Sequence, residues 1–557
     1  MQGIVAGAVD LAAQWLDAAD QAETASQRRQ REQFQQLIGS PEGVAFTRVF
    51  VDRVMRVDDD DLAAEIFHDL VVEHGRPQFL PSTDRLLVAA GARVAPVLPS
   101  VAMPLARRRV RRMLSTLIGP SEPKPLRTTL RRLTDANFRA NVNLLGEAVL
   151  GEDEARNRLA KVIDLVRRPE VDYVSVKVSA IASQLHPWAF EANLDRIQAR
   201  LEELWRAASD RPDPVFVNLD MEEYRDLDLT VAAFTRVLEQ DEFAHLDAGI
   251  VMQAYLPDSV GILDQLLDWA SERHAATGAT TRFRFVKGAN LAMERLEGAL
   301  HGHTPAPYPD KAAVDANYKH LVDMAFDPGR LAGAQVGIAS HNLFDLAFAH
   351  LLADARGVGD RVGFEMLSGM ATAQANVIVR HRPVRLYLPV VGADDFDAAV
   401  AYLFRRLEEN TQPGNFLTES FSIAPGSETF DRQAEEFRAS VAARDDQASG
   451  SRRWTGHVGH PTYPDVPARE TSGVAAMHTP VPDTVALAGS VVDDAGFTNW
   501  PEADPTDPDV RTAMTAELEE DPAVEVAPPP TVQEVDAAVA YLFRRLEENT
   551  QPGNFLT

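Results

Sequence analysis

Eight short β-rich segments alternate with helical segments in the middle of the chain, and this alternation restricts the fold more than any other feature. The segments are residues 142–145, 173–178, 215–219, 249–254, 282–286, 334–339, 362–366 and 384–390. Strands that alternate with helices form parallel sheets, and eight such units within about 270 residues are typical of a closed barrel and not of an open sheet. The sequence therefore predicts an α/β fold, a (β/α)8 TIM-like barrel.

The same pattern divides the chain into four regions. Residues 1–135 contain helical patterns broken by Gly and Pro, and we expect a helical N-terminal arm and domain there. Residues 136–430 hold the barrel. Residues 431–534 are expected to be a linker or an extended segment, because residues 448–508 within them are rich in Gly, Pro, Ser, Thr and Asp. Residues 535–557 contain a duplicate, because the sequence of residues 397–418 recurs without one change at 536–557.

Composition limits the classes of function. The chain has 55 Lys and Arg against 83 Asp and Glu, and its net charge of −28 argues against nucleic acid as a partner and against broad binding to anionic membranes. The arginine-rich run at 107–112 is a local exception; it fits a solvated helix face better than a contact with an anionic partner or a membrane surface. No apolar stretch approaches the ~18 residues that span a bilayer, so we expect a cytoplasmic protein.

Polar residues gather at the predicted carboxyl ends of the strands, where barrel enzymes have their active sites. They are Lys177, Asp220, Gln253, Tyr255, Arg284, Lys287, Ser340, His341, Asn342, Glu365 and Tyr387. Each of them alone fits a polar residue that closes the barrel rim, but seven strands contributing together indicate a site. Its excess of Lys and Arg suits a phosphate-bearing cofactor and a carboxylate substrate. No metal is expected, because His301 with His303 and His457 with His460 lack further ligands.

The duplicated helix carries a second candidate site. Tyr402, Arg405, Arg406 and Glu409 lie at positions i, i+3, i+4 and i+7, so they share one stripe of a helix. Two adjacent guanidinium groups fit a carboxylate or a phosphate. The opposite stripe is apolar, and periodicity alone therefore favours an ordinary amphipathic helix with a solvated charged face.

In their order along the chain, these motifs resemble those of the proline dehydrogenase family. The motifs are Val174-Ser-Val-Lys177, Phe216-Val-Asn-Leu-Asp220, Val251-Met-Gln253-Ala-Tyr255, Arg284-Phe-Val-Lys287-Gly-Ala, Ser340-His341-Asn342 and Tyr402-Leu-Phe-Arg405-Arg406-Leu-Glu-Glu409. The chain as a whole is similar to the N-terminal part of a bacterial bifunctional proline utilisation flavoenzyme. The resemblance implies that FAD binds in the barrel and that the helix with the two arginines lies over the barrel mouth, with its charged stripe facing inward.

The resemblance also implies the reaction, which is oxidation of L-proline to 1-pyrroline-5-carboxylate by hydride transfer to FAD, the first step of proline catabolism. The residues expected at the substrate are Lys177, Asp220, Tyr387, Tyr402, Arg405, Arg406 and Glu409. Those expected at FAD are Gln253, Arg284, Lys287, Gly288, Ala289, Ser340, His341, Asn342 and Glu409. One position departs from the family pattern, because Asn290 stands where many members have a tyrosine.

Several partners and alternatives stay open. We expect a quinone as the electron acceptor, and both peripheral contact with the inner face of the cytoplasmic membrane and self-association through the duplicated helix remain open. The aldehyde dehydrogenase half of the bifunctional enzymes is expected to be absent, because its mechanism needs a cysteine and the chain has none. The competing interpretations are a Schiff-base aldolase with Lys177 as nucleophile and a non-catalytic scaffold.

Overall fold

The structure is a computed structural model, and it describes most of the chain up to residue 452. The structure does not describe residues 26, 30, 33–45, 47–48, 56, 58, 76–81, 115–116, 146–148, 150, 186–188, 302, 393–418, 420–422 and 453–557. Both copies of the duplicated helix, and therefore Tyr402, Arg405, Arg406 and Glu409, lie outside the described residues.

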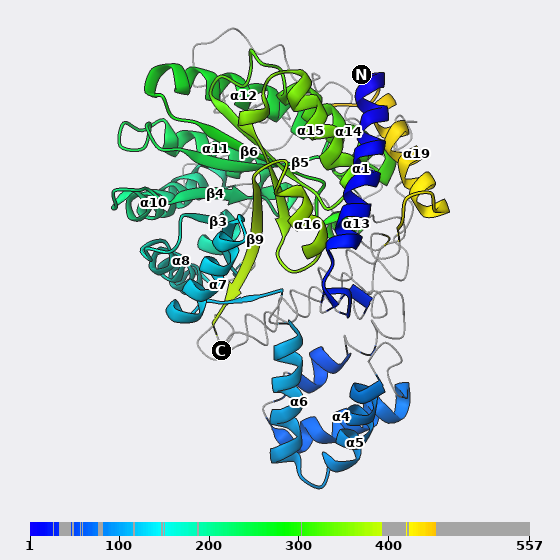
Figure 1. Cartoon of the computed structure of the whole chain (residues 1–557). Helices are drawn as coiled ribbons and strands as arrows, with labels where there is room; N and C mark the ends of the chain where they lie inside the picture. The colour runs from blue at the N-terminus through cyan, green and yellow to red at the C-terminus, as the bar shows by residue number, and fades with distance from the viewer. Residues whose placement is uncertain are drawn as a thin grey trace, which may run out of the picture.

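Eight parallel strands form a closed barrel, as the sequence predicts (Figure 1). They are β2 (Arg139–Leu144), β3 (Tyr173–Lys177), β4 (Phe216–Asp220), β5 (Ala248–Gln253), β6 (Thr281–Val286), β7 (Ala334–Ala339), β8 (Val362–Leu367) and β9 (Val384–Val391). Each strand from β2 to β8 pairs with the next strand along the chain, and β9 closes the ring by pairing with both β8 and β2. The predicted (β/α)8 fold is confirmed, and the strand ends differ from the predicted ones by only a few residues.

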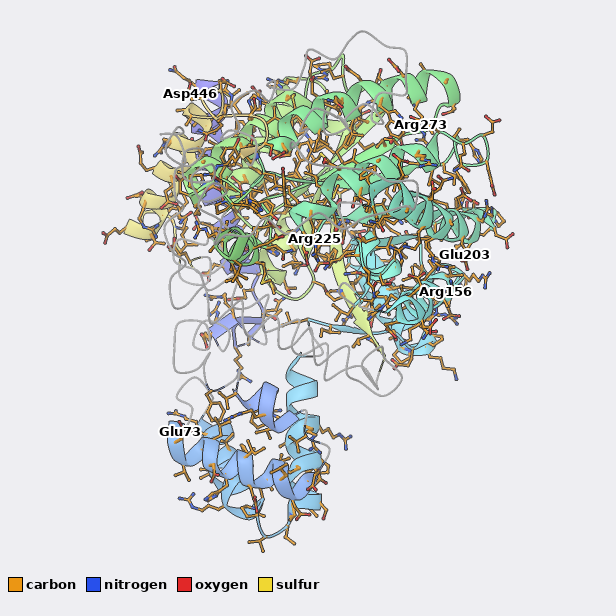
Figure 2. All side chains as sticks on the ribbon, turned by 180° about the vertical axis from the view of Figure 1, so that it is seen from behind. Glu73, Arg156, Glu203, Arg225, Arg273 and Asp446 are labelled. Atoms are coloured by element: carbon orange, nitrogen blue, oxygen red, sulfur yellow. The ribbon has the colours of Figure 1, made fainter. Side chains whose placement is uncertain are left out.

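Helices cover the outside of the barrel. They are α8 (Glu152–Val166), α9 (Val178–Ile181), α10 (Phe190–Ser209), α11 (Leu227–Leu238), α12 (Asp258–Thr277), α13 (Leu291–His301), α14 (Lys311–Ala325), α15 (Leu343–Ala355) and α16 (Thr372–Ile378). Single turns of 3-10 helix, η3 (Tyr224–Asp226) and η4 (Gly359–Arg361), precede α11 and β8. Each large helix buries an apolar stripe on the sheet and leaves charges outside; Figure 2 shows Arg156 on α8 and Glu203 on α10 in such outer positions.

The first helix belongs to the barrel surface. Helix α1 (Gln2–Ala22) packs against α15 and α16, and Figure 1 shows it running along that side of the barrel. Its buried residues recur at helical spacing and include Trp15 and Leu16. The Trp15 ring lies 5.3 Å from that of His381 and 6.1 Å from that of His350, measured between centroids. The helical N-terminal region is therefore not a single unit.

A separate group of helices forms what we call the small helical region. It comprises the π-helical segment η1 (Phe50–Met55) and the helices α4 (Asp60–His74), α5 (Ser82–Val94) and α6 (Pro99–Leu114). These helices share a core of their own that includes Phe50, Phe67 and Met103. In Figure 1 the region lies apart from the barrel, and Figure 2 shows Glu73 on it.

Three further elements complete the fold. The two-residue strand β1 (Gly119–Pro120) pairs with β9, and α7 (Pro123–Asp135) leads into β2. Helix α19 (Glu428–Ala442) packs on α14 and α15, where Phe437 stacks on Phe344. Helix α19 therefore packs on the barrel although it lies mostly beyond residue 430. The domain limits at 135, 430 and 534 stay predictions.

Candidate active site

A network of buried charges crosses the inside of the barrel. Arg284 on β6 donates from Nε to Oε2 of Glu365 on β8 at 2.6 Å, and from Nη1 to Oδ1 of Asp220 on β4 at 2.6 Å. Arg282, two residues earlier on the same strand, donates to the other oxygen of Glu365 at 3.0 Å. Side chains two residues apart on a strand point to the same face, so β6 directs both arginines into the barrel. Four ionised groups from three strands thus form one connected network.

Glycines on β7 and β8 make room for this network. A Cβ atom on Gly337 would collide with Oε1 of Glu365, and one on Gly363 would lie 3.2 Å from Nη2 of Arg282. Both glycines occupy inward positions in register with each other, and Gly337 also pairs with Arg284. Any larger residue would need the space that the ion pairs occupy, so these glycines serve close packing.

The partners of each charge fix its ionisation. Burial alone would lower the pKa of Arg284, but the carboxylates of Glu365 and Asp220 raise it well above the ordinary value. Burial alone would raise the pKa of Glu365, but the guanidinium groups of Arg284, Arg282 and Arg385 lower it to about 2. Arg284 and Glu365 are therefore both ionised at neutral pH.

Tyr387 extends the network toward the mouth of the barrel. Its hydroxyl donates to Oδ2 of Asp220 at 3.1 Å and accepts from Nδ2 of Asn143. Arg284 lies over its ring, 5.6 Å from the centroid, and donates from Nη2 to Oγ of Ser175 at 3.2 Å. A guanidinium has five N–H donors, and three of those on Arg284 are used by Glu365, Asp220 and Ser175. The other two donors of Arg284 have no partner among the described residues.

Lys177 lies beside this network on β3, in register with Asp220. Its Nζ pairs with Oε1 of Glu222 at 2.9 Å, and Oε2 of Glu222 accepts from Ser179 at 3.1 Å. This ion pair engages the nitrogen that a Schiff base would require. Glu222 follows β4 by two residues and was not among the predicted site residues, although its place just beyond a strand end could have indicated it.

The loop that follows β4 also anchors two other strand ends. The backbone oxygen of Glu222 accepts from Nδ2 of Asn290 at 2.9 Å and from Nε2 of Gln253 at 3.4 Å. Asn290 is buried, so the residue that departs from the family pattern points inward and stabilises the loop. Gln253 lies at the end of β5, as predicted.

Lys287, just beyond β6, belongs to a second charged cluster. Its Nζ lies 2.5 Å from Oδ1 of Asp315 on α14 and 3.0 Å from Oδ2 of Asp345 on α15. Asp345 also pairs with the fully buried Lys319, and Asp315 pairs with Lys311 at 2.6 Å. Burial opposes the shift, but the two carboxylates raise the pKa of Lys287. Neither acid was predicted, because both come from helices.

Gly288 and Ala289 form the turn after Lys287. Gly288 has a φ of +122°, and a Cβ atom there would collide with the ring of Tyr255. The backbone N–H of Tyr255 donates to the oxygen of Lys287 at 2.7 Å, which holds the turn against β5. Only glycine meets both demands, the left-handed backbone and the close approach.

The residues Ser340, His341 and Asn342 follow β7 and have different tasks. Asn342 caps α15, because its Oδ1 accepts from the N–H of Phe344 at 2.9 Å. Ser340 donates to Oδ2 of Asp345 at 3.3 Å. His341 accepts through Nε2 from the N–H of Leu367 at 3.0 Å, and burial lowers its pKa to about 4. Asn342 thus has a clear structural role, whereas His341 faces the strand ends.

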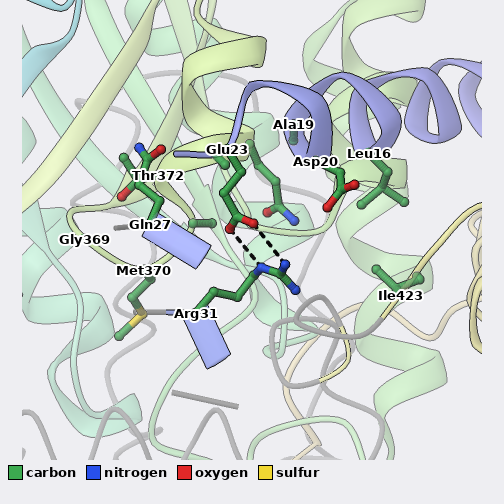
Figure 3. A pocket seen from close by; sticks show the side chains of 13 residues that line it. Leu16, Ala19, Asp20, Glu23, Gln27, Arg31, Gly369, Met370, Thr372 and Ile423 are labelled. Carbon is green, nitrogen blue, oxygen red and sulfur yellow. Dashed lines mark hydrogen bonds and ion pairs between the residues drawn. The ribbon is translucent and has the colours of Figure 1, made fainter. Parts of the chain in front are cut away.

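A pocket lies between the N-terminal arm and the loop after β8 (Figure 3). Its walls include Asp20 and Glu23 from the arm and Thr372 from α16. Glu23 binds Arg31 through two hydrogen bonds of 2.8 and 2.9 Å, drawn as dashed lines in Figure 3. The Arg31 side chain lowers the pKa of Glu23. None of the predicted site residues that the structure describes lines this pocket, so we do not place the active site there.

The described residues contain no group of three or more His, Asp or Glu side chains that could hold a metal ion. His457 and His460 lie outside the described residues. In the same part of the chain, no helix is long and apolar enough to cross a membrane.

Comparisons with known proteins agree with the motifs. The family model for proline dehydrogenase matches residues 126–419, more than half of the chain. A proline dehydrogenase of Deinococcus radiodurans is 26% identical over 324 residues, which are 57% of this chain and 92% of that protein. Proline dehydrogenase 2 of Bacillus subtilis is 25% identical over 301 residues, 54% of this chain and 86% of that protein.

Solved structures give the same result for the fold. Proline utilization A (PutA) from Corynebacterium freiburgense is 43% identical, with a TM-score of 0.57 over 71% of this chain and 37% of that one. PutA from Bdellovibrio bacteriovorus, 24% identical, has a TM-score of 0.64 over 83% of this chain and 46% of that one, a likeness of fold alone. The chain thus spans less than half of either PutA. On the family match over residues 126–419, it belongs to the proline dehydrogenase family.

Proposed function

We propose that this barrel binds FAD and oxidises L-proline to 1-pyrroline-5-carboxylate. The observation that carries the proposal is the chain of hydrogen bonds from Tyr387 through Asp220 to Arg284 and Glu365, which fixes a hydroxyl and a guanidinium at the mouth of the barrel. The family match favours this reaction over a Schiff-base aldolase, and the ion pair of Lys177 with Glu222 also speaks against an aldolase.

The strand ends fit a cofactor rich in acceptor atoms. Because Nε2 of His341 accepts a hydrogen bond, the proton of the neutral ring is inferred to lie on Nδ1. This Nδ1 is buried and has no hydrogen-bond partner among the described residues. A buried donor without a hydrogen-bond partner costs about 1 to 3 kcal/mol of folding free energy. Nδ1 of His341 is therefore suited to donate to an acceptor atom of a bound ligand.

The residues proposed to hold FAD come from three strand ends. They are Gln253, Arg284, Lys287, Gly288, Ala289, Ser340, His341, Asn342 and, from the duplicated helix, Glu409. The two remaining donors of Arg284 and the cation of Lys287 suit the polar and phosphate parts of the cofactor. When bound, FAD supplies the chemistry of hydride acceptance, which no side chain can provide.

The protein's own task is to bind and orient proline in a site without water. We propose that Arg405 and Arg406 hold the proline carboxylate with help from Lys177, that Tyr387 and Tyr402 form walls beside the ring, and that Glu409 orients an arginine. Asp220 would hold Tyr387 in place, since the two already share a hydrogen bond. Tyr402, Arg405, Arg406 and Glu409 lie outside the described residues, so their roles rest on the resemblance.

We further propose a quinone as the electron acceptor and a cytoplasmic location. The spectrum of the holoprotein tests the reaction. Adding L-proline without oxygen should bleach the flavin absorbance, whereas L-alanine, which has the carboxylate but no ring, should not. An oxidised spectrum that persists with proline contradicts the proposal.

The duplicate provides a matched control for the substrate clamp. Arg405→Met with Arg406→Met should lose about 2 to 5 kcal/mol of proline binding while FAD stays bound, because a carboxylate in a dry site loses its partners. Arg544→Met with Arg545→Met makes the same change in an identical sequence and should leave the KM for proline unchanged. We expect the first copy to act because it follows β9 closely in the chain. The opposite result would assign the clamp to the duplicate.

A further inference from the structure

The partner of Lys177 at the barrel mouth comes from a loop and not from a strand. Nζ of Lys177 lies 2.9 Å from Oε1 of Glu222, and the two side chains are 14% and 4% exposed. Asp220, the acid in register with Lys177, accepts from Arg284 at 2.6 Å and from Tyr387 at 3.1 Å. The acid on β4 thus belongs to the central network, and Glu222 provides a separate carboxylate for Lys177.

Glu222 is itself held at both its side chain and its backbone. Oε2 of Glu222 accepts from Oγ of Ser179 on α9 at 3.1 Å. The backbone oxygen of Glu222 accepts from Nδ2 of Asn290 at 2.9 Å and from Nε2 of Gln253 at 3.4 Å. All three donors belong to buried residues. The position of the carboxylate is therefore fixed by residues that follow three different strands or end them.

A lysine needs such a partner if it is to bind an anion at a defined place. Its ammonium group sits at the end of a flexible chain of four carbons, so the side chain alone does not fix its position. The ammonium has three N–H donors, and the bond to Glu222 uses one of them. The other two have no partner among the described residues. A cation that is already fixed binds an anion with a smaller loss of entropy than a mobile one.

We propose that Glu222 is a positioning residue for the substrate. It fixes the ammonium of Lys177 so that the two remaining donors meet the carboxylate of L-proline, and Asn290 supports it by holding its backbone. The inference rests on the proposed function, in which Lys177 helps to hold that carboxylate. It also gives a task to Asn290, which stands where many members of the family have a tyrosine and here donates to the loop of Glu222.

Glu222→Gln is the central test, because charge alone and positioning predict opposite results. Loss of a negative charge beside a site for carboxylates would by itself strengthen the binding of proline. Loss of the partner that fixes Lys177 would weaken it. We expect weaker binding, with a KM for L-proline about tenfold higher and a kcat changed by less than about twofold, because the contact only holds the substrate. An unchanged or lower KM would overturn the proposal.

A double-mutant cycle shows whether Glu222 acts through Lys177. Lys177→Met should also raise the KM about tenfold or more, because it removes the cation itself. Lys177→Met combined with Glu222→Gln should raise the KM no further, since Glu222 then has no ammonium to position. If the two effects multiply instead, Glu222 acts independently of Lys177 and the proposal is wrong.

Two further variants leave every charge in place, so they test the proposal even if Glu222→Gln disturbs the loop. Ser179→Ala removes the hydrogen bond to Oε2 of Glu222, and Asn290→Ala removes the one to its backbone oxygen. Each should raise the KM for proline about two- to fivefold, because the carboxylate is then held less firmly. Neither should raise the KM further when it is added to Lys177→Met. A further rise in that background would contradict an action through Lys177.

Glu223→Gln is the matched control. It makes the same change of a carboxylate to an amide one position away, where the acid pairs with Arg225 at 2.6 Å. The KM of this variant should equal that of the unchanged chain. Equal effects of Glu223→Gln and Glu222→Gln would overturn the proposal, because any negative charge in this loop would then serve.

The binding of cyclopentanecarboxylate separates this proposal from the proposed reaction. The acid has the ring and the carboxylate of proline but no nitrogen, so it cannot be oxidised to the imine. Isothermal titration calorimetry of the FAD-containing protein measures its Kd, which Glu222→Gln should raise about tenfold. If proline does not bleach the flavin but the Kd rises in this way, the positioning role stands and the proposed reaction is wrong. If proline bleaches the flavin and Glu222→Gln changes neither the KM nor the Kd, the reaction stands and the positioning role is wrong.

Discussion

The inside of the barrel and the small helical region both reverse the usual distribution of residues. In the barrel, Arg284, Asp220 and Glu365 are charged and buried. In the small helical region, leucines and valines of α5 and α6 are apolar and exposed. Globular proteins normally avoid both arrangements, because each one costs free energy in water.

The two regions differ in how the free-energy cost of their arrangement is offset. Each charge in the barrel has partners within the same network, so the structure itself stabilises them. The exposed leucines have no such compensation within the described chain. Buried charges that all have partners indicate a site built into the fold. Exposed apolar side chains without partners in the described chain indicate a surface that another molecule covers.

The largest expected effect comes from removing the cation at the centre of the barrel. Arg284→Met would leave Asp220 and Glu365 buried with fewer partners, and we expect a loss of about 3 to 5 kcal/mol in the free energy of unfolding. Urea unfolding of the FAD-free protein measures it. Arg284→Met combined with Asp220→Asn should recover part of the loss, since Glu365 keeps Arg282 as its partner and no buried carboxylate then lacks a cation. If Arg284→Met left the free energy of unfolding unchanged, the network would not stabilise the barrel.

The next largest loss of stability is expected at Gly337, which leaves space for the buried charges. Gly337→Ala would place a methyl group against Glu365, and we expect a loss of about 1 to 3 kcal/mol. Gly261→Ala is the matched control on α12, where no atom lies within 4 Å of the new Cβ atom and alanine favours the helix. Equal melting temperatures for the two variants would contradict the close packing at Gly337.

Acid should weaken the site through His341. Its pKa is about 4 in the folded chain against an ordinary value of 6.5, so between these values the unfolded chain binds a proton that the folded chain does not. The free energy of unfolding should therefore be highest above pH 6.5 and should fall by about 1 to 3 kcal/mol as the pH falls to 4. His341→Asn should flatten this part of the curve of unfolding free energy against pH. A curve of unchanged slope would contradict the burial of His341.

The smallest effect is expected on the exposed face. Leu105→Ser should change the free energy of unfolding by no more than about 0.5 kcal/mol, because the side chain is 61% exposed. Met103→Ala, two residues away on the same helix, removes a fully buried side chain and should cost about 2 to 5 kcal/mol. If Leu105→Ser cost as much, the face would be part of the core and the comparison with the barrel would fail.

Much of the fold was predictable because its signals are local. The run at 362–366 predicts a strand from its four apolar and glycine positions, and the structure places β8 at Val362–Leu367. The family was predictable from motifs such as Arg284-Phe-Val-Lys287, and the family match confirms it. The packing of α1 on α15 and α16 was not predictable, because those helices lie more than 300 residues away in the chain.

The sequence by itself determined which residues stand at the ends of strands, since strand and helix patterns depend on neighbours within a few positions. Lys177, Asp220 and Gln253 could be named on that basis. Only the tertiary structure decided their partners. Arg284 meets Glu365 across 81 positions, and Lys287 meets acids that belong to two different helices. Closure of the barrel brings these groups together, and no local pattern records a contact between distant strands.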